Sequence, residues 1–242
     1  MPKLVIGTTG PTIFNSEIQA MIETYYKATP LYITQNGTED LKWVMENIDA
    51  LILAGGNDIH PMTYGQPVTH GDGLSKFDLM RDKRELFLID ACIKAGKPIL
   101  GICRGLQIIC VRYGFGFYAN IGGDIAHSPG EIKLNIPKGE ALHFIECLHE
   151  FKDKYFEESQ PVLSFHHQGV AVPRTYVNDH NGINIVAIAD TDTNSKDNKE
   201  IVEIAESQKL QIIACQCHPE VDYMYGNLVS NKVLERFKEF LA

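Results

Sequence analysis

The chain has 242 residues, of which 44% are hydrophobic and 22% are charged, and this balance excludes a disordered, collagen-like or coiled-coil protein. Its net charge of −9 would repel a phosphate backbone, so we expect no nucleic-acid partner. No apolar run approaches the roughly 18 residues that a membrane-spanning helix needs, and the N-terminus lacks a signal-peptide pattern. We therefore expect a cytoplasmic protein without membrane contact, whose six cysteines are thiols.

Strand and helix patterns alternate from the N-terminus through the first half of the chain. Short apolar runs predict strands at Leu4–Thr8, Leu31–Ile33, Ala50–Ala54 and Ile99–Ile102. Residues at helical spacing predict a helix that begins at Ser16 and helices at Thr38–Asn47, Phe77–Ala95 and Leu106–Tyr113. Glu39 and Asp40 are expected in the first turn of the second of these helices. This alternation is typical of a parallel sheet with helices on both faces.

The second half of the chain has a different pattern, with strands that follow one another more directly. Strands are predicted at Val162–Phe165, Ile183–Ala189, Ile201–Ala205 and Ile212–Gln216, and an amphipathic helix at Leu228–Leu241. The polar segment Asp190–Glu200 is interpreted as a hairpin loop, whereas residues 115–160 give no clear pattern. We expect a single α/β domain over residues 1–242, with a mostly parallel central sheet flanked by helices and an antiparallel extension.

The run from Gly101 to Gly105 contains the strongest chemical signal, a cysteine between two glycines at the junction of a predicted strand and helix. The serine form of this arrangement is the nucleophile elbow, in which a sharp turn exposes the reactive atom at the carboxyl edge of the sheet. The adjacent helix N-terminus favours the thiolate form of Cys103. The alternative is an ordinary small, buried cysteine.

A cysteine nucleophile needs a base and a group that orients the base. His218 follows the strand at Ile212–Gln216, and Pro219 biases it towards an extended backbone. Residues two apart in an extended chain face the same side, so we expect Glu220 to reach the imidazole ring. The alternative is a solvated histidine beside an unrelated glutamate.

Two other runs favour a site at the ends of these strands. Gly55 and Gly56 follow a buried strand, where their backbone could approach a bound oxygen or could simply form a tight turn. Cysteines 215 and 217 beside His218 suggest a metal site, but the spacing of a zinc finger is absent, and we predict no bound metal.

Taken together, these residues resemble the class I glutamine amidotransferase-like superfamily, and most closely its gamma-glutamyl-gamma-aminobutyrate hydrolase branch. The matching runs, in chain order, are Leu53–Pro61 with Tyr64-Gly65, Asp82–Glu85, Gly101–Gln107, Ser164–Gln168 and Gln216–Glu220. The sequence departs from the family pattern where Cys215 and Cys217 replace a glycine and an aromatic residue, and where residues 115–160 are altered.

The resemblance implies a flavodoxin-like fold, a Cys103–His218–Glu220 triad and no cofactor or metal. It also implies that Gly56 and Arg104 supply backbone N–H groups to an oxyanion hole. Gln107, His167 and Gln168 are implied to bind the head group of a gamma-glutamyl substrate.

The activity expected from this resemblance is hydrolysis of the gamma-glutamyl amides of small amines through a thioester. One alternative is a glutaminase subunit that passes ammonia to a separate synthase partner, and another is a non-catalytic binding protein on the same fold. The amine, the pathway and the oligomeric state, including a homodimer, stay open.

Overall fold

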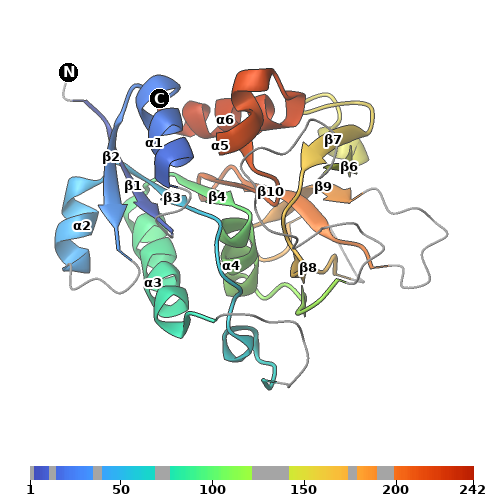
Figure 1. Ribbon diagram of the computed structural model, residues 1–242, viewed down its shortest axis with the longest axis horizontal. Helices are drawn as coiled ribbons and strands as arrows, with labels where there is room; N and C mark the ends of the chain where they lie inside the picture. The colour runs from blue at the N-terminus through green and yellow to red at the C-terminus, as the bar shows by residue number, and fades with distance from the viewer. Residues whose placement is uncertain are drawn as a thin grey trace.

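The computed structural model describes residues 3–10, 15–34, 40–68, 77–121, 142–173, 179–189 and 199–242. Within these ranges, nine strands form a central sheet in the order β2-β1-β3-β4-β11-β10-β9-β6-β7 (Figure 1). The strands that pair in parallel are β2 (Thr29–Ile33), β1 (Val5–Thr9), β3 (Ala50–Leu53), β4 (Ile99–Ile102) and β11 (Ile212–Cys215). Their order is that of a flavodoxin-like sheet.

The remaining four strands form the antiparallel extension that the sequence predicts. They are β10 (Val202–Ser207), β9 (Asn184–Ala189), β6 (Leu142–Cys147) and β7 (Gln160–Leu163). Short strands β5 (Phe117–Tyr118) and β8 (Gly169–Val170) pair separately. The mostly parallel α/β fold with an antiparallel extension is thus confirmed.

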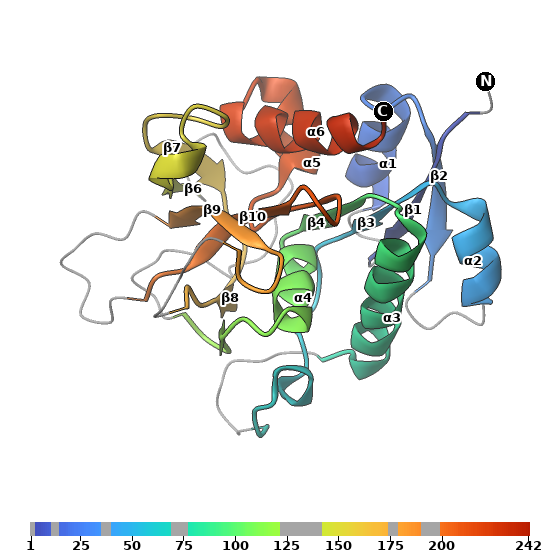
Figure 2. The ribbon, with the colours of Figure 1, turned by 180° about the vertical axis from the view of Figure 1, so that it is seen from behind.

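Helices cover both faces of the sheet (Figures 1 and 2). One face carries α1 (Asn15–Thr24), α5 (Pro219–Asp222) and α6 (Leu228–Phe240), and the other carries α2 (Leu41–Asn47), α3 (Leu79–Ala95) and α4 (Arg104–Arg112). Successive residues of a strand point to opposite faces, so Ala50 and Ile52 pack beneath α1 and α6, whereas Leu51 and Leu53 pack against the other helices.

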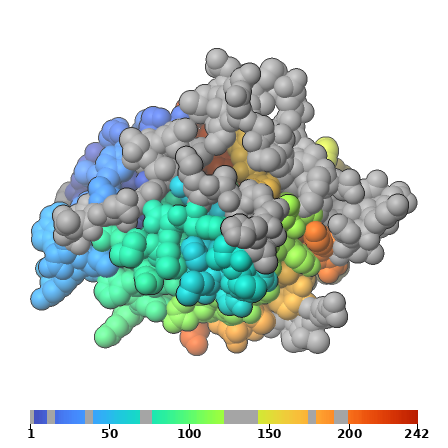
Figure 3. Space-filling view, turned by 60° about the horizontal axis from the view of Figure 1, so that its bottom comes forward, coloured from blue at the N-terminus to red at the C-terminus, as the bar shows by residue number. Residues whose placement is uncertain are grey.

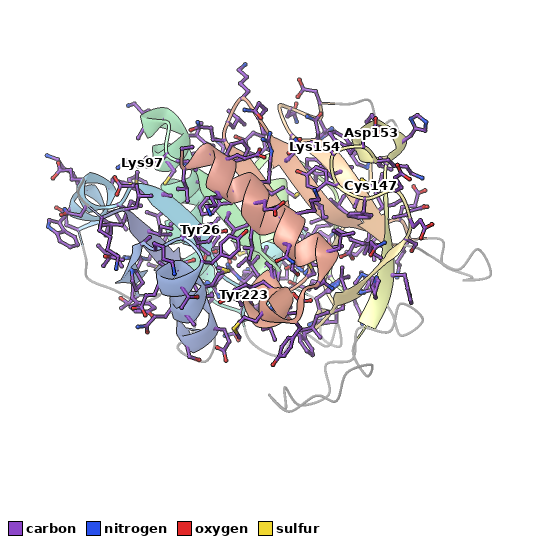
Figure 4. The ribbon with its side chains drawn as sticks, turned by 90° about the horizontal axis from the view of Figure 1, so that it is seen from above. Tyr26, Lys97, Cys147, Asp153, Lys154 and Tyr223 are labelled. Carbon is purple, nitrogen blue, oxygen red and sulfur yellow. The ribbon has the colours of Figure 1, made fainter. Side chains whose placement is uncertain are left out.

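The two faces have separate apolar cores. Figure 4 shows Tyr26 between α1 and α6, where its hydroxyl donates a hydrogen bond to the carbonyl of Leu234 at 3.2 Å. On the opposite face, Figure 3 shows α3 beside the segment that contains the short helix η2 (Pro61–Tyr64). The Thr63 hydroxyl in that segment donates to the Asp82 carboxylate on α3 at 2.6 Å.

Local capping explains where several helices begin. Asp78 caps α3 by accepting from the Arg81 backbone N–H, and Asn227 caps α6 by accepting from that of Ser230. Asp40 caps α2, so the prediction that it lies in the first turn is wrong, and residues 38 and 39 lie outside the described residues. α4 begins at Arg104, two residues earlier than predicted.

The poorly patterned region 115–160 contains β5, β6 and the short helix η3 (His149–Phe151), with residues 122–141 outside the description. The predicted loop at 190–200 also falls largely outside it. In the described part of the chain, no helix has the length and apolarity needed to cross a bilayer.

A close approach between β3 and α4 depends on Gly105. A Cβ atom added at this residue would lie 2.1 Å from the carbonyl oxygen of Leu53, which is backbone and cannot rotate away. We predict that Gly105→Ala lowers the free energy of unfolding by about 3 kcal/mol because of this overlap. The measurement is urea unfolding beside Gly96→Ala, whose added Cβ meets no atom within 4 Å and whose left-handed backbone costs about 1 kcal/mol. A Gly105→Ala protein as stable as the wild type would contradict this packing.

Candidate active site

Three neighbouring parallel strands, β3, β4 and β11, end at the same edge of the sheet. Ligands of open α/β sheets bind outside the carboxyl ends of the strands. Gly55 follows β3, Cys103 follows β4 and His218 follows β11. A Cβ atom added at Gly55 would lie 3.3 Å from Cε1 of His218 and 3.9 Å from Sγ of Cys103, so the three segments meet at one point.

Cys103 occupies a strained turn between β4 and α4, with φ of 54° and ψ of −106°. A residue other than glycine in such a conformation costs about 1–3 kcal/mol and persists only where its surroundings enforce it. The backbone N–H of Cys103 donates to the carbonyl of Cys215 on β11 at 2.7 Å. Gly101 and Gly105 are in backbone contact across the turn, and a Cβ at Gly101 would lie 2.8 Å from Gly105. The sharp elbow expected from the sequence is therefore present.

His218 and Glu220 form a buried pair, with 2.8 Å between Nδ1 of His218 and Oε1 of Glu220. The carboxylate can only accept, so Nδ1 carries the proton and Nε2 is left for the thiol. Glu220 reaches the ring as expected, but the predicted extended backbone is wrong. Pro219 begins the short helix α5, and the first helical turn brings Glu220 back onto His218.

The electrostatic surroundings favour a protonated His218. Burial by itself would lower the pKa of its imidazole, but the charges of Glu220 and Cys103, with a hydrogen bond from each, raise the pKa well above its ordinary value. A cationic His218 can donate a proton to a leaving group near neutral pH.

A second polar side chain contacts the thiol. The fully buried Gln216 donates from Nε2 to Sγ of Cys103 at 3.4 Å. Its Oε1 accepts from Nε2 of Gln107 at 3.1 Å, and this bond defines which end of the Gln216 amide faces the sulfur. The same Gln107 nitrogen also donates to the carbonyl of Gln168 at 3.1 Å. Gln107 therefore supports Gln216, and its contact with a substrate stays a prediction.

Gln168 is buried, whereas its neighbour His167 is partly exposed. The Gln168 side chain is buried and accepts from the backbone N–H of Ile59 at 2.9 Å, which joins two loops. The partly exposed His167 places Nε2 3.0 Å from both carboxylate oxygens of Asp58. The hydrogen bond and charge of Asp58 raise the pKa of His167 despite its partial burial. Substrate contact by either residue stays a prediction.

A buried charge network lies directly behind these loops, and we define it as Arg81, Asp82, Glu85 and Arg104. The Arg104 guanidinium binds both Asp82 and Glu85, while Nε of Arg81 donates to Glu85 at 2.8 Å. Two cations balance two carboxylates, as burial of charge requires. The two guanidinium charges hold the pKa of Glu85 below its ordinary value, although burial opposes them.

The network also holds the glycine turn after β3. Arg81 Nη2 donates to the carbonyl of Ala54 at 2.7 Å and to that of Gly55 at 3.0 Å. A trans peptide directs its N–H opposite to its carbonyl, so the Gly56 N–H points away from Arg81. Arg104 has two roles here. Its side chain belongs to the charge network, and its backbone begins helix α4 directly after Cys103.

Sequence reasoning missed Arg81, Gln216 and Asp58 as members of this region. Arg81 and Glu85 are four residues apart on a predicted helix, a spacing that signals an ion pair. Asp58 lies in a run that carries the family resemblance, but its partner His167 is 109 residues away.

The two cysteines near His218 are buried free thiols. Cys215 is buried and directs its thiol to the carbonyl of Cys217 at 3.6 Å. Among the described residues, one group of three side chains of ligand type has its potential ligand atoms within 4.8 Å of one another, and it consists of His143, His166 and Glu203. The absence of a metal at the cysteines stays a prediction.

Known proteins resemble this chain in sequence and in structure. It is 32% identical over 195 residues to the glutamine amidotransferase-like protein YvdE of Lactococcus lactis, covering 79% of this chain and 74% of that one. A crystal structure of a glutamine amidotransferase from Thermotoga maritima matches with a TM-score of 0.61 and 15% identity, over 100% of this chain and 97% of the other.

The glutaminase domain of Trypanosoma brucei CTPS with bound acivicin matches with a TM-score of 0.60 at 14% identity, over 99% of this chain and 94% of that one. These structural likenesses confirm the fold. The Peptidase C26 family matches residues 6–220, a range that includes Cys103, His218 and Glu220. The chain therefore belongs to the Peptidase C26 family and is a cysteine-type amidohydrolase or amidotransferase.

Proposed function

We propose that the protein hydrolyses the gamma-glutamyl amide bond of small gamma-glutamyl amines to glutamate and free amine. The observation that carries this proposal is the strained Cys103, held against a His218 whose pKa is raised by its Glu220 partner. Simple binding of a ligand does not need a strained thiol beside an oriented base.

In the proposed reaction, the Cys103 thiolate attacks the delta-carbonyl carbon of the glutamyl unit. His218 donates its Nε2 proton to the departing amine nitrogen, which leaves a glutamyl thioester on the sulfur. Neutral His218 then takes a proton from water, and the hydroxide releases glutamate and restores the thiolate. Glu220 stabilises the imidazolium, and acid–base catalysis of this kind contributes about 10² to 10⁴ in rate.

Negative charge on the carbonyl oxygen is proposed to be stabilised by the backbone N–H groups of Gly56 and Arg104. The Gly56 N–H is suited to this role because Arg81 binds the carbonyl of Gly55, and the trans peptide then directs the Gly56 N–H away from Arg81. The Arg104 N–H is at the first position of α4, where N–H groups have no partner within the helix.

The head group of the substrate carries one positive and one negative charge. The His167 and Asp58 pair offers the complementary charges, with 22% and 14% of the two side chains exposed. We propose that this pair binds the alpha-carboxylate and the alpha-ammonium group, with Oε1 of Gln107 and Gln168 as neighbours. We assign no residue to the leaving amine.

The second candidate is a glutaminase subunit that releases ammonia to a separate synthase. It is favoured by the likeness to proteins named as glutamine amidotransferases. Both candidates share the thioester half-reaction, so they are separated by the preferred leaving group. A non-catalytic binding protein is the third and weakest candidate, and an inert Cys103 thiol would favour it.

The substrate proposal predicts a strict glutamyl side and a tolerant amine side. A site that hydrogen-bonds charged groups rejects analogues without them, so acetylation of the alpha-amine should lower kcat/KM by about 10⁴. An apolar pocket for the amine would change kcat/KM by about 10- to 200-fold for each methylene added to or removed from the amine. The substrates are glutamine and a series of gamma-glutamyl amines of increasing length, each with a free and with an N-acetylated alpha-amine. Released glutamate is measured for each, and Cys103→Ala serves as the blank. Equal rates for the acetylated compounds would refute the head-group site, and a preference for glutamine would favour the glutaminase.

The His218–Glu220 pair predicts a defined change in pH dependence. Glu220→Gln removes the charge that raises the pKa of His218 but leaves the burial that lowers it, so this pKa should fall. The form with a protonated His218 is lost as the pH rises through its pKa, and the alkaline limb of kcat/KM should therefore move to lower pH. The matched control is Glu46→Gln on the exposed surface of α2. An unmoved alkaline limb in folded Glu220→Gln would mean that another group controls it.

A further inference from the structure

A second cluster of ligand-type side chains lies in the antiparallel half of the sheet. His143 belongs to β6, Glu203 to β10, and His166 to the segment between β7 and β8. The strands β6 and β10 flank β9 (Figure 1), so the cluster joins segments that are far apart in the chain. The Glu203 and His166 side chains are almost completely buried, with 0% and 2% exposed, and that of His143 is 9% exposed.

The distances within the cluster are close to those between ligands around one ion. Nε2 of His143 lies 3.1 Å and Nε2 of His166 lies 3.8 Å from the same Glu203 oxygen, and one potential ligand atom from each residue lies within 4.8 Å of the others. A tetrahedral zinc ion, with bonds of about 2.0–2.2 Å, places its ligand atoms roughly 3.3–3.6 Å apart.

The hydrogen bond on the far side of His166 determines which nitrogen faces the cluster. Nδ1 of His166 lies 2.8 Å from the carbonyl oxygen of Gln168, which can only accept, so Nδ1 carries the proton. When the ring is neutral, Nε2 directs a lone pair towards the Glu203 carboxylate.

A lone pair and a carboxylate oxygen repel one another unless a proton or a metal cation lies between them, and the buried cluster offers a place for either. Histidines that bind metals commonly donate their other ring N–H to a backbone carbonyl, as His166 does. Imidazole and carboxylate ligands suit zinc and neighbouring transition metals, whereas calcium and magnesium prefer oxygen ligands throughout.

We propose that His143, His166 and Glu203 bind one divalent transition-metal ion of the zinc class. Three protein ligands leave a fourth position for water. The ion would join β6 and β10 to the segment that precedes His167, and no step of the proposed reaction passes through it. This proposal revises the expectation of a metal-free protein, but at a place separate from the cysteines. The competing interpretation is a metal-free ion pair between His143 and Glu203.

The site would also support the catalytic edge of the sheet. The backbone carbonyl of Glu203 accepts from the N–H of Gln216 at 2.8 Å. The rings of Phe165, next to His166, and of His218 lie 5.4 Å apart. Loss of the ion should therefore lower thermal stability and loosen the loop that carries His167.

The test begins with the full-length protein, stripped by a chelator and then dialysed against zinc or cobalt(II). Elemental analysis should find about one ion per chain, and the thermal midpoint should rise with zinc concentration. Bound cobalt should show the visible bands of nitrogen and oxygen ligands without the charge-transfer band of thiolate ligands. This spectrum separates the proposed site from Cys215 and Cys217 without any variant.

Variants then assign the ligands. Glu203→Gln and His166→Gln should each weaken zinc binding by at least roughly tenfold, whereas the exposed His149→Gln and the double variant Cys215→Ser/Cys217→Ser should bind as the wild type does. A wild-type protein that binds neither ion refutes the proposal and favours the metal-free pair. A cobalt–thiolate band, or unchanged affinity in both ligand variants, also refutes it.

Discussion

The candidate active site of this protein depends on the buried charge network of Arg81, Asp82, Glu85 and Arg104. Burial of an ion costs several kcal/mol, and the cost is offset only when its partners are close and well oriented. Here each arginine contacts a carboxylate, and Glu85 bridges both. Loss of one partner from such a set typically costs about 3–5 kcal/mol. The network therefore constrains the position of every segment that it binds.

Those segments are the ones that form the candidate site. The Thr9 hydroxyl at the end of β1 donates to Glu85 at 2.6 Å, and Arg81 holds the carbonyls that precede Gly56. Arg104 attaches the first residue of α4 to the same carboxylates, directly after the strained Cys103. The strain at the thiol is thus maintained by close glycine packing on one side and by buried charge on the other. Such a rigid arrangement suits chemistry that depends on the position of the reacting atoms.

Much of the fold could be predicted from the sequence because its signals are local. The buried strands appear as continuous apolar runs, and the helices appear as apolar residues at helical spacing. β6 was missed because half of its residues are exposed or polar, and because it pairs with β9 some forty residues further along the chain. The helix boundaries differ where a side chain such as Asp40 caps rather than enters the helix.

The candidate site was predictable to the extent that its residues are neighbours in sequence. Cys103 with its glycines, and His218 with Glu220, are both short patterns. The contact of Gln216 with the thiol, the His167–Asp58 pair and the His143–His166–Glu203 cluster join residues on different strands or loops. Only folding brings these side chains together, so these contacts cannot be predicted from composition or periodicity.

The most direct measurement of the central claim is the location of the covalent intermediate. The protein is mixed with a gamma-glutamyl amide, quenched in acid within a turnover and analysed by peptide mass spectrometry. The account predicts one added glutamyl group, on the peptide that contains Cys103, which hydroxylamine removes as the glutamyl hydroxamate. A glutamyl group on any other residue, or steady turnover in Cys103→Ala, would contradict it.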